Sequence, residues 1–125
     1  MGTRYIIDSN ILIKFEGRLL PEMAQAYIAN IIDEDFNISV ISEIEVLGHH
    51  SATKEVEEFI GLANLFEVDK AIRTATIQLR KQYKIKLPDA IIAATALAHG
   101  LTLITQNEKD FVNINGLKVV NPYNV

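Results

Sequence analysis

The chain of 125 residues is 49% apolar and 22% charged, which is typical of a single globular domain over residues 1–125. It contains no cysteine and no apolar run near the ~20 residues that span a bilayer, so we expect a cytoplasmic protein without disulfides, thiolate metal sites or a membrane anchor. The net charge of −4 argues against a protein that coats nucleic acid without selectivity.

The first half of the chain alternates short apolar runs with amphipathic segments. Residues 4–8 (RYIID) predict a buried strand, and a short helix over 11–15 should follow. Apolar residues spaced three and four apart predict a second helix after Pro21. Residues 37–41 (NISVI) predict the second strand, and the next helix should begin at Ser42.

The second half continues this alternation. A helix with an apolar face around Val56, Phe59 and Ile60 leads to a weak strand over 65–68, and a helix over 70–84 follows. An almost entirely apolar helix then runs from Pro88 to His99 and is closed by Gly100. The last two strands are residues 101–105 (LTLIT) and 117–120 (LKVV). Such alternation predicts an α/β domain with a mainly parallel central sheet.

Four acidic residues occur where such a sheet places its functional sites, outside the carboxyl ends of the strands. Asp8 ends the first strand, and Glu45 should lie in the first turn of the helix after the second strand. Asp89 opens a helix that starts at the same edge, and Asp110 follows the fourth strand. We therefore expect four carboxylates that are distant in sequence to meet at one edge of the sheet.

Each acid also has a purely structural interpretation. Asp8 could cap the next helix, and Ser42 with Glu45 fits the S-x-x-E capping box. Asp89 suits the positive end of a helix dipole, and Asp110 could be a surface turn residue. Any one of these explanations is adequate alone, but the presence of all four acids at one edge is harder to dismiss.

Clustered carboxylates indicate metal-dependent chemistry. They repel one another, and burial makes their ionisation more costly. A hard divalent cation such as Mg²⁺ or Mn²⁺ offsets that cost and prefers oxygen ligands. Because Mg²⁺ keeps several waters, phosphate oxygens and an attacking water can also bind. The acids therefore favour hydrolysis of phosphodiester bonds.

Three blocks of the sequence carry a resemblance to a known family. They are residues 5–13 (YIIDSNILI), 38–48 (ISVISEIEVLG) and 87–111 (LPDAIIAATALAHGLTLITQNEKDF). Together they resemble the PIN-domain nucleases, specifically the VapC-type toxins of toxin–antitoxin pairs, over nearly the whole chain. The resemblance implies a three-layer α/β/α sandwich and an endoribonuclease that uses Mg²⁺ or Mn²⁺. It also implies an RNA substrate, a homodimer and a cognate antitoxin whose tail covers the acidic pocket.

The resemblance also assigns roles to individual positions. The catalytic and metal-binding positions would be Asp8, Glu45, Asp89 and Asp110. The fourth role falls to Asp110 because residues 105–111 read T-x-N-x-x-D-F, so Asn107 would be a neutral or water-mediated contact. Asn10 and Thr105 match polar residues that support the ligands. With Asn107 in place of an acid, the number of metal ions stays open.

Residues 70–86 contain six of the twelve basic residues and no acid. Alone, this stretch is typical of a solvated helix face. Beside phosphodiester chemistry it becomes a candidate RNA-binding rim, because specificity needs contacts beyond the metal. The candidate RNA-binding residues are Arg73, Arg80, Lys81 and Lys84. The apolar face around Val56 either belongs to the core or contacts a partner.

Two alternative functions remain. One is a catalytically inactive PIN-like module that binds RNA or a protein partner; the presence of all four acids counts against it. The other is a phospho-receiver domain, which usually has two adjacent acids after the first strand and a Lys-Pro pair after a later strand. Here Asp8 is followed by Ser9, and Lys-Pro does not occur, so this alternative is far less favoured.

Overall fold

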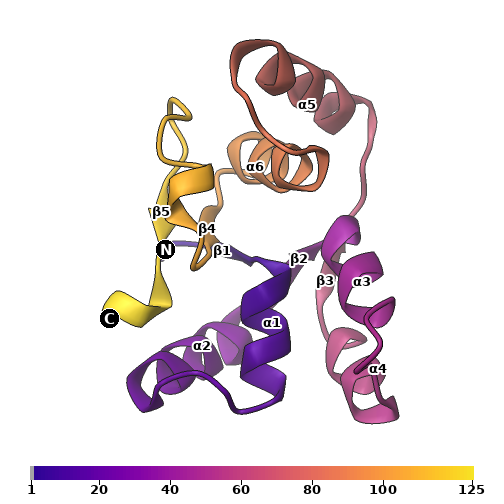
Figure 1. Cartoon of the computed structure of the whole chain (residues 1–125), viewed down its shortest axis with the longest axis vertical. Coiled ribbons are helices and arrows are strands. Elements are labelled where there is room, and N and C mark those ends of the chain that lie inside the picture. Colours follow the sequence, from indigo (N-terminus) through magenta and orange to yellow (C-terminus); the bar gives the residue numbers. More distant parts are fainter. Residues whose placement is uncertain (1) are drawn as a thin grey trace.

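The computed structural model describes residues 2–125 (Figure 1). Its elements in chain order are β1 (Tyr5–Ile7), α1 (Ser9–Glu16), α2 (Glu22–Glu34), β2 (Asn37–Ser39), α3 (Val40–Leu47), α4 (Lys54–Ile60), β3 (Asn64–Phe66), α5 (Lys70–Gln82), α6 (Leu87–His99), β4 (Thr102–Ile104), the 3-10 helix η1 (Glu108–Asp110), β5 (Val119–Val120) and the 3-10 helix η2 (Pro122–Asn124). Every predicted helix and strand is present, although the strands are shorter than expected. Within the described residues, no helix has the length and apolar character that crossing a bilayer requires.

The strands pair only in parallel within this part of the chain. β4 pairs with β1 on one side and β5 on the other, while β2 pairs with β3. β1 and β2 lie side by side, and a side chain bridges their junction: Asn37 Nδ2 donates to the Tyr5 carbonyl oxygen over 2.9 Å. The order β3-β2-β1-β4-β5 therefore has its switch point beside β1, where the chain returns to the other side of the sheet.

The alternation of side chains along the strands divides the core into two layers. Ile6 and its register partner Leu103 pack with α5 and α6, whereas Ile7 and Ile104 pack with α1 and α2. Figure 1 shows α6 between α5 and the strands, and α1 and α2 on the opposite side. Residues 90–96 of α6 are all buried, as its apolar sequence predicted. Helices thus cover both faces of a mainly parallel sheet, which confirms the α/β/α sandwich.

Helix α3 begins two residues earlier than predicted. Ser39 ends β2, and its Oγ accepts a hydrogen bond from the Ile41 N–H over 3.1 Å, so the helix starts at Val40. The predicted start at Ser42 was wrong, because the capping hydroxyl comes from Ser39. Ser42 is instead fully buried inside α3, so the proposed capping box with Glu45 was also wrong. Glu45 consequently lies in the second turn of the helix rather than the first.

The apolar face of α4 packs into the core. Val56 and Ile60 are buried in the layer formed with α1 and α2. Phe59 is half-buried and stacks on Phe15 of α1, with 5.7 Å between the ring centroids. The core interpretation of this face is therefore confirmed for Val56 and Ile60.

Candidate active site

Asp8 is fixed at the carboxyl edge of the sheet by the register of β1 and β4. Because Ile7 pairs with Ile104, Asp8 and Thr105 leave the sheet side by side, and Thr105 Oγ1 donates to Asp8 Oδ2 over 2.8 Å. The backbone N–H of Ser9 donates to Asp8 Oδ1, also over 2.8 Å. Asp8 is only 7% exposed. It therefore caps α1, as its structural interpretation required, while remaining at the predicted edge.

Glu45 reaches the same edge from α3. Ser9 Oγ donates to Glu45 Oε1 over 2.6 Å, which links the start of α1 to α3. Glu43 is two residues earlier and lies roughly 200° around the helix, so it cannot face the same point. Sequence reasoning did not assign a role to Ser9. Its position could have indicated a role, because Ser9 directly follows Asp8 at the point where the strand ends and a helix begins.

Asp89 and Asp110 complete the acidic edge from α6 and η1. Asp89 lies in the first turn of α6, as predicted, and Asp110 is exposed at the end of η1. Burial raises the pKa of Asp89 to about 6, and the charges of Asp8 and Asp110 contribute to that rise. The positive charge of Lys86 acts in the opposite direction.

The pKa of Asp8 is also raised. Burial is the main cause, and the charges of Glu45 and Asp110 add to it. The hydrogen bonds from Thr105 and Ser9 partly offset this rise, because they favour the ionised carboxylate. The four acids are thus brought near enough to influence one another electrostatically, from four separate segments of the chain.

The three supporting residues are placed differently. Thr105 is fully buried and receives a hydrogen bond from the Asn107 N–H over 3.1 Å, so Asn107 orients the hydroxyl that holds Asp8. Asn107 itself is exposed. Asn10 is exposed in the first turn of α1, and in residues 2–125 its side chain makes no hydrogen bond to the four acids.

The donor chemistry of this edge suits a hard divalent cation. Among the described residues, no three acidic or histidine side chains already form a group that could hold a metal ion. Burial and, to a smaller extent, the neighbouring acids nevertheless raise the pKa values of Asp8 and Asp89, and an oxygen-binding cation would offset both effects. The carboxylates therefore fit such a cation in type and charge, although they do not form a closed ligand shell.

A cleft of about 580 Å³ joins part of this acidic edge to basic residues at the end of α5 and in the segment that follows it. Asp89 and Asp110 lie in its lining. The basic residues that line it are Arg80, Lys84, Lys86 and Lys109. Arg73 and Lys81 are exposed on α5 but are not part of this lining in the described chain. The structure thus separates the four predicted RNA-binding residues into two pairs, and adds Lys86 and Lys109 to the cleft.

Comparison with known proteins places the chain in a family. The family model of the PIN domain matches residues 5–117. Ribonuclease VapC1 of Rickettsia felis is 31% identical over 92% of this chain and 93% of its own length. A toxin–antitoxin complex from Klebsiella pneumoniae contains a chain 34% identical, with a TM-score of 0.78 and coverage of 95% of this chain and 98% of its own. VapBC2 of Rickettsia felis, bound to a promoter DNA fragment, has a TM-score of 0.79 at 21% identity, with coverage of 95% and 98%, and shares the fold. The chain belongs to the PIN-domain family.

Proposed function

We propose that this PIN domain is a metal-dependent endoribonuclease and the toxin of a toxin–antitoxin pair. The observation that carries the proposal is the acidic edge, where four carboxylates from four segments meet beside a basic cleft. The similarity to Ribonuclease VapC1 supports RNA as the substrate, and the similarity to a chain of a toxin–antitoxin complex supports a toxin role.

In this proposal, Asp8, Asp89 and Asp110 bind a divalent cation, with Mg²⁺ or Mn²⁺ as the metal. Glu45 is a further ligand or the carboxylate that orients the attacking water. When bound, the metal would polarise the scissile phosphate and lower the pKa of water. The remaining positions act through hydrogen bonds: Thr105, oriented by Asn107, fixes Asp8. We assign Asn10, which is exposed beside Asp8, to contact with the substrate phosphate or a ligand.

We assign the path of the RNA to the cleft that contains Asp89 and Asp110. A strand of RNA with its scissile phosphate at the acids would place neighbouring phosphates against the basic wall of the cleft. Of the four predicted RNA-binding residues, Arg80 and Lys84 are therefore the most suited to backbone contacts, and Arg73 and Lys81 would contribute only at longer range.

The proposed partners follow from the toxin role. An antitoxin would silence the enzyme by covering the acidic edge, and two copies of the chain would form a homodimer. We further propose that residues 1–125 act as one nuclease domain in the cytoplasm, where the RNA substrate is present.

The first test is cleavage of a mixed RNA pool in Mg²⁺ or Mn²⁺ by the wild type, by Asp8→Asn and by the control Asp33→Asn. Asp33 is an exposed acid of α2 and lies outside the proposed site. Asp8→Asn should reduce cleavage by about a hundredfold or more, because it removes one charge from the metal site. Asp33→Asn should cleave like the wild type.

The same assay separates the alternative function. A wild type that binds Mn²⁺ and RNA but cuts nothing would favour the inactive binding module. A wild type that binds no metal at all would overturn the proposal and leave Asp8 as a helix cap.

The second test compares two double variants of the basic stretch, residues 70–86, that each remove two positive charges. Both are made in the Asp8→Asn background so that the RNA stays intact. Arg80→Ala with Lys84→Ala should weaken RNA binding and reduce the dependence of log K on log[salt] by about 1.4, the value for two single-strand phosphate contacts. Arg73→Ala with Lys81→Ala should change the slope much less. Equal effects of the two pairs would contradict a path through the cleft.

A further inference from the structure

Ser9 donates to two different acids of the site. Its backbone N–H donates to Asp8 Oδ1 over 2.8 Å, and its hydroxyl donates to Glu45 Oε1 over 2.6 Å. Ser9 is the first residue of α1 and is 6% exposed, so its position is fixed by the helix start and by the surrounding core. Ser9 thus connects Asp8, which directly follows β1, with Glu45 on α3, which lies 36 positions after Ser9.

Glu45 depends on such a contact more than the buried Asp8 does. Asp8 has a short side chain and receives hydrogen bonds on both of its oxygens. Glu45 is exposed in the second turn of α3, and its longer side chain has more torsional freedom to lose on being fixed. The negative charges of Asp8 and Asp89 repel the Glu45 carboxylate. Without a fixed donor, this repulsion would turn the carboxylate toward solvent.

A hydroxyl that donates to a carboxylate makes a charge-assisted hydrogen bond, and 2.6 Å lies within the range of the strong ones. Because the donor is buried and the acceptor is exposed, the bond holds the mobile partner against the fixed one. Glu45 makes this bond through Oε1, and in residues 2–125 Oε2 is left available for a cation or a water.

We infer that Ser9 is a positioning residue whose hydroxyl holds Glu45 toward Asp8, so that both acids serve one divalent cation. This inference rests on the proposed function for the role of the cation, but not for the conformation of Glu45. Ser9 acts through Glu45 and does not itself contact substrate.

The test uses the full chain, free of any antitoxin, and Mn²⁺ as the probe, with binding measured by calorimetry. Ser9→Ala should weaken Mn²⁺ binding by about tenfold, the lower range for loss of a residue that orients a ligand. Ser9→Thr keeps the hydroxyl and should restore most of the affinity. Thr76→Ala is the matched control: Thr76 is also 6% exposed, but its hydroxyl donates to Ile72 O within α5.

A double-variant cycle separates positioning from general destabilisation. In a Glu45→Gln background, Ser9→Ala should cause no further loss of Mn²⁺ affinity or of kcat/KM on RNA, because its effect passes through the Glu45 carboxylate. Additive losses, or a Ser9→Ala protein that binds Mn²⁺ as tightly as the wild type, would overturn the inference.

The conformation of Glu45 gives a readout that needs neither metal nor activity. Side-chain couplings measured by NMR in the metal-free wild type should report one rotamer for Glu45, and rotamer averaging in Ser9→Ala. Averaging in the wild type would overturn the inference even if Ser9→Ala fails to fold. If the wild type neither binds Mn²⁺ nor cleaves RNA, the proposed function fails while these couplings still decide whether Ser9 holds Glu45.

Discussion

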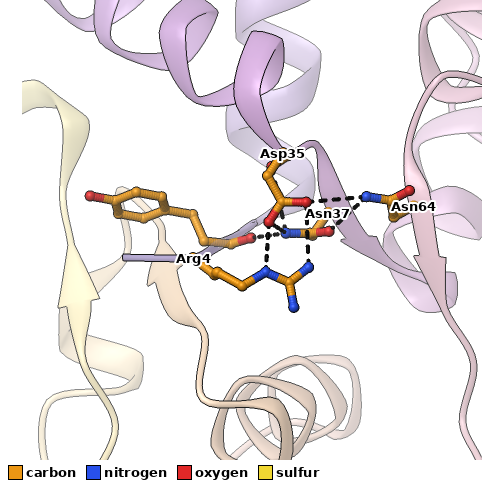
Figure 2. Close-up of polar contacts among 5 residues, drawn as sticks. Arg4, Asp35, Asn37 and Asn64 are labelled. Carbon is orange, nitrogen blue, oxygen red and sulfur yellow. Dashed lines mark hydrogen bonds and ion pairs between the residues drawn. The ribbon is translucent and has the colours of Figure 1, made fainter. Parts of the chain in front are cut away.

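The two edges of the sheet use carboxylates in opposite ways. At the amino edge, Asp35 accepts hydrogen bonds from Arg4 Nε over 2.7 Å, from Asn37 Nδ2 over 2.9 Å and from Asn64 Nδ2 over 3.3 Å (Figure 2). These donors lower the pKa of Asp35, chiefly through Arg4. At the carboxyl edge, burial and neighbouring acids raise the pKa of Asp8 and of Asp89.

The difference distinguishes a structural cluster from the proposed metal site. At the amino edge Arg4, Asn37 and Asn64 all donate to Asp35, and the network joins the first residues of β2 and β3 to the residue before β1. The acidic edge instead places like charges together, which costs stability that a bound cation would restore. A cluster of acids with raised pKa values is therefore a better indicator of a binding site than an acid that is merely buried.

Substitution of Asn37, at the amino edge, should have the largest effect on stability. This side chain is fully buried and bridges β1 and β2, where no backbone pairing connects the two strands. Asn37→Leu should lower the free energy of unfolding by about 2–3 kcal/mol, because Asp35 and Asn64 lose a partner as well. Urea unfolding measures this change. Asn30→Ala, at an exposed position of α2, is the control and should change stability little.

At the acidic edge, a substitution is expected to raise the free energy of unfolding instead of lowering it. In a chelating buffer at pH 7.5, Asp89→Asn should raise the free energy of unfolding by about 1 kcal/mol. The pKa of Asp89 rises from an ordinary ~3.9 to about 6, which limits this gain in the free energy of unfolding to about 3 kcal/mol. Because Asp89 is partly solvated, the expected gain is smaller than that limit. The carboxyl binds its proton more tightly in the folded state, so the wild type gains stability as the pH falls from about 6 to ~4.

Asp89→Asn lacks this gain, so the two proteins should converge near pH 4. The measurement is urea unfolding across that pH range, with Asp33→Asn as the control at an exposed acid. A variant less stable than the wild type at pH 7.5 would show that the acidic edge is not under repulsive strain.

The sequence predicted the acidic edge better than it predicted the amino edge. Asp8 and Asp89 were located from local signals, an apolar run before Asp8 and Pro88 before Asp89, and parallel topology then required a common edge. Asn37 gave no such signal, because its partners Tyr5 and Asn64 lie 32 and 27 residues away and meet it only once the strands are in register.

Details of side-chain pairing were also beyond the sequence. The bond between Ser9 and Glu45 depends on how α1 packs against α3, and the start of α3 depended on which of two serines supplied the cap. Periodicity and composition do not decide either point, since both depend on tertiary contacts.

The smallest predicted effect concerns the ion pair between Arg4 and Asp35, whose contribution to stability depends on pH. The pKa of Asp35 is lowered in the folded state, so the stabilisation is present above the ordinary pKa of ~3.9 and is lost as the pH falls through the lowered value. Asp35→Asn should therefore melt at a lower temperature than the wild type at pH 7, and the difference should shrink as acid is added. This trend is opposite to that of Asp89, where the variant is the more stable protein at neutral pH. Because the ion pair is solvent-accessible, 0.5 M salt should also reduce the difference in melting temperature at pH 7. A difference that neither acid nor salt changes would show that the hydrogen bonds from Asn37 and Asn64, rather than the charge of Arg4, hold Asp35 in place.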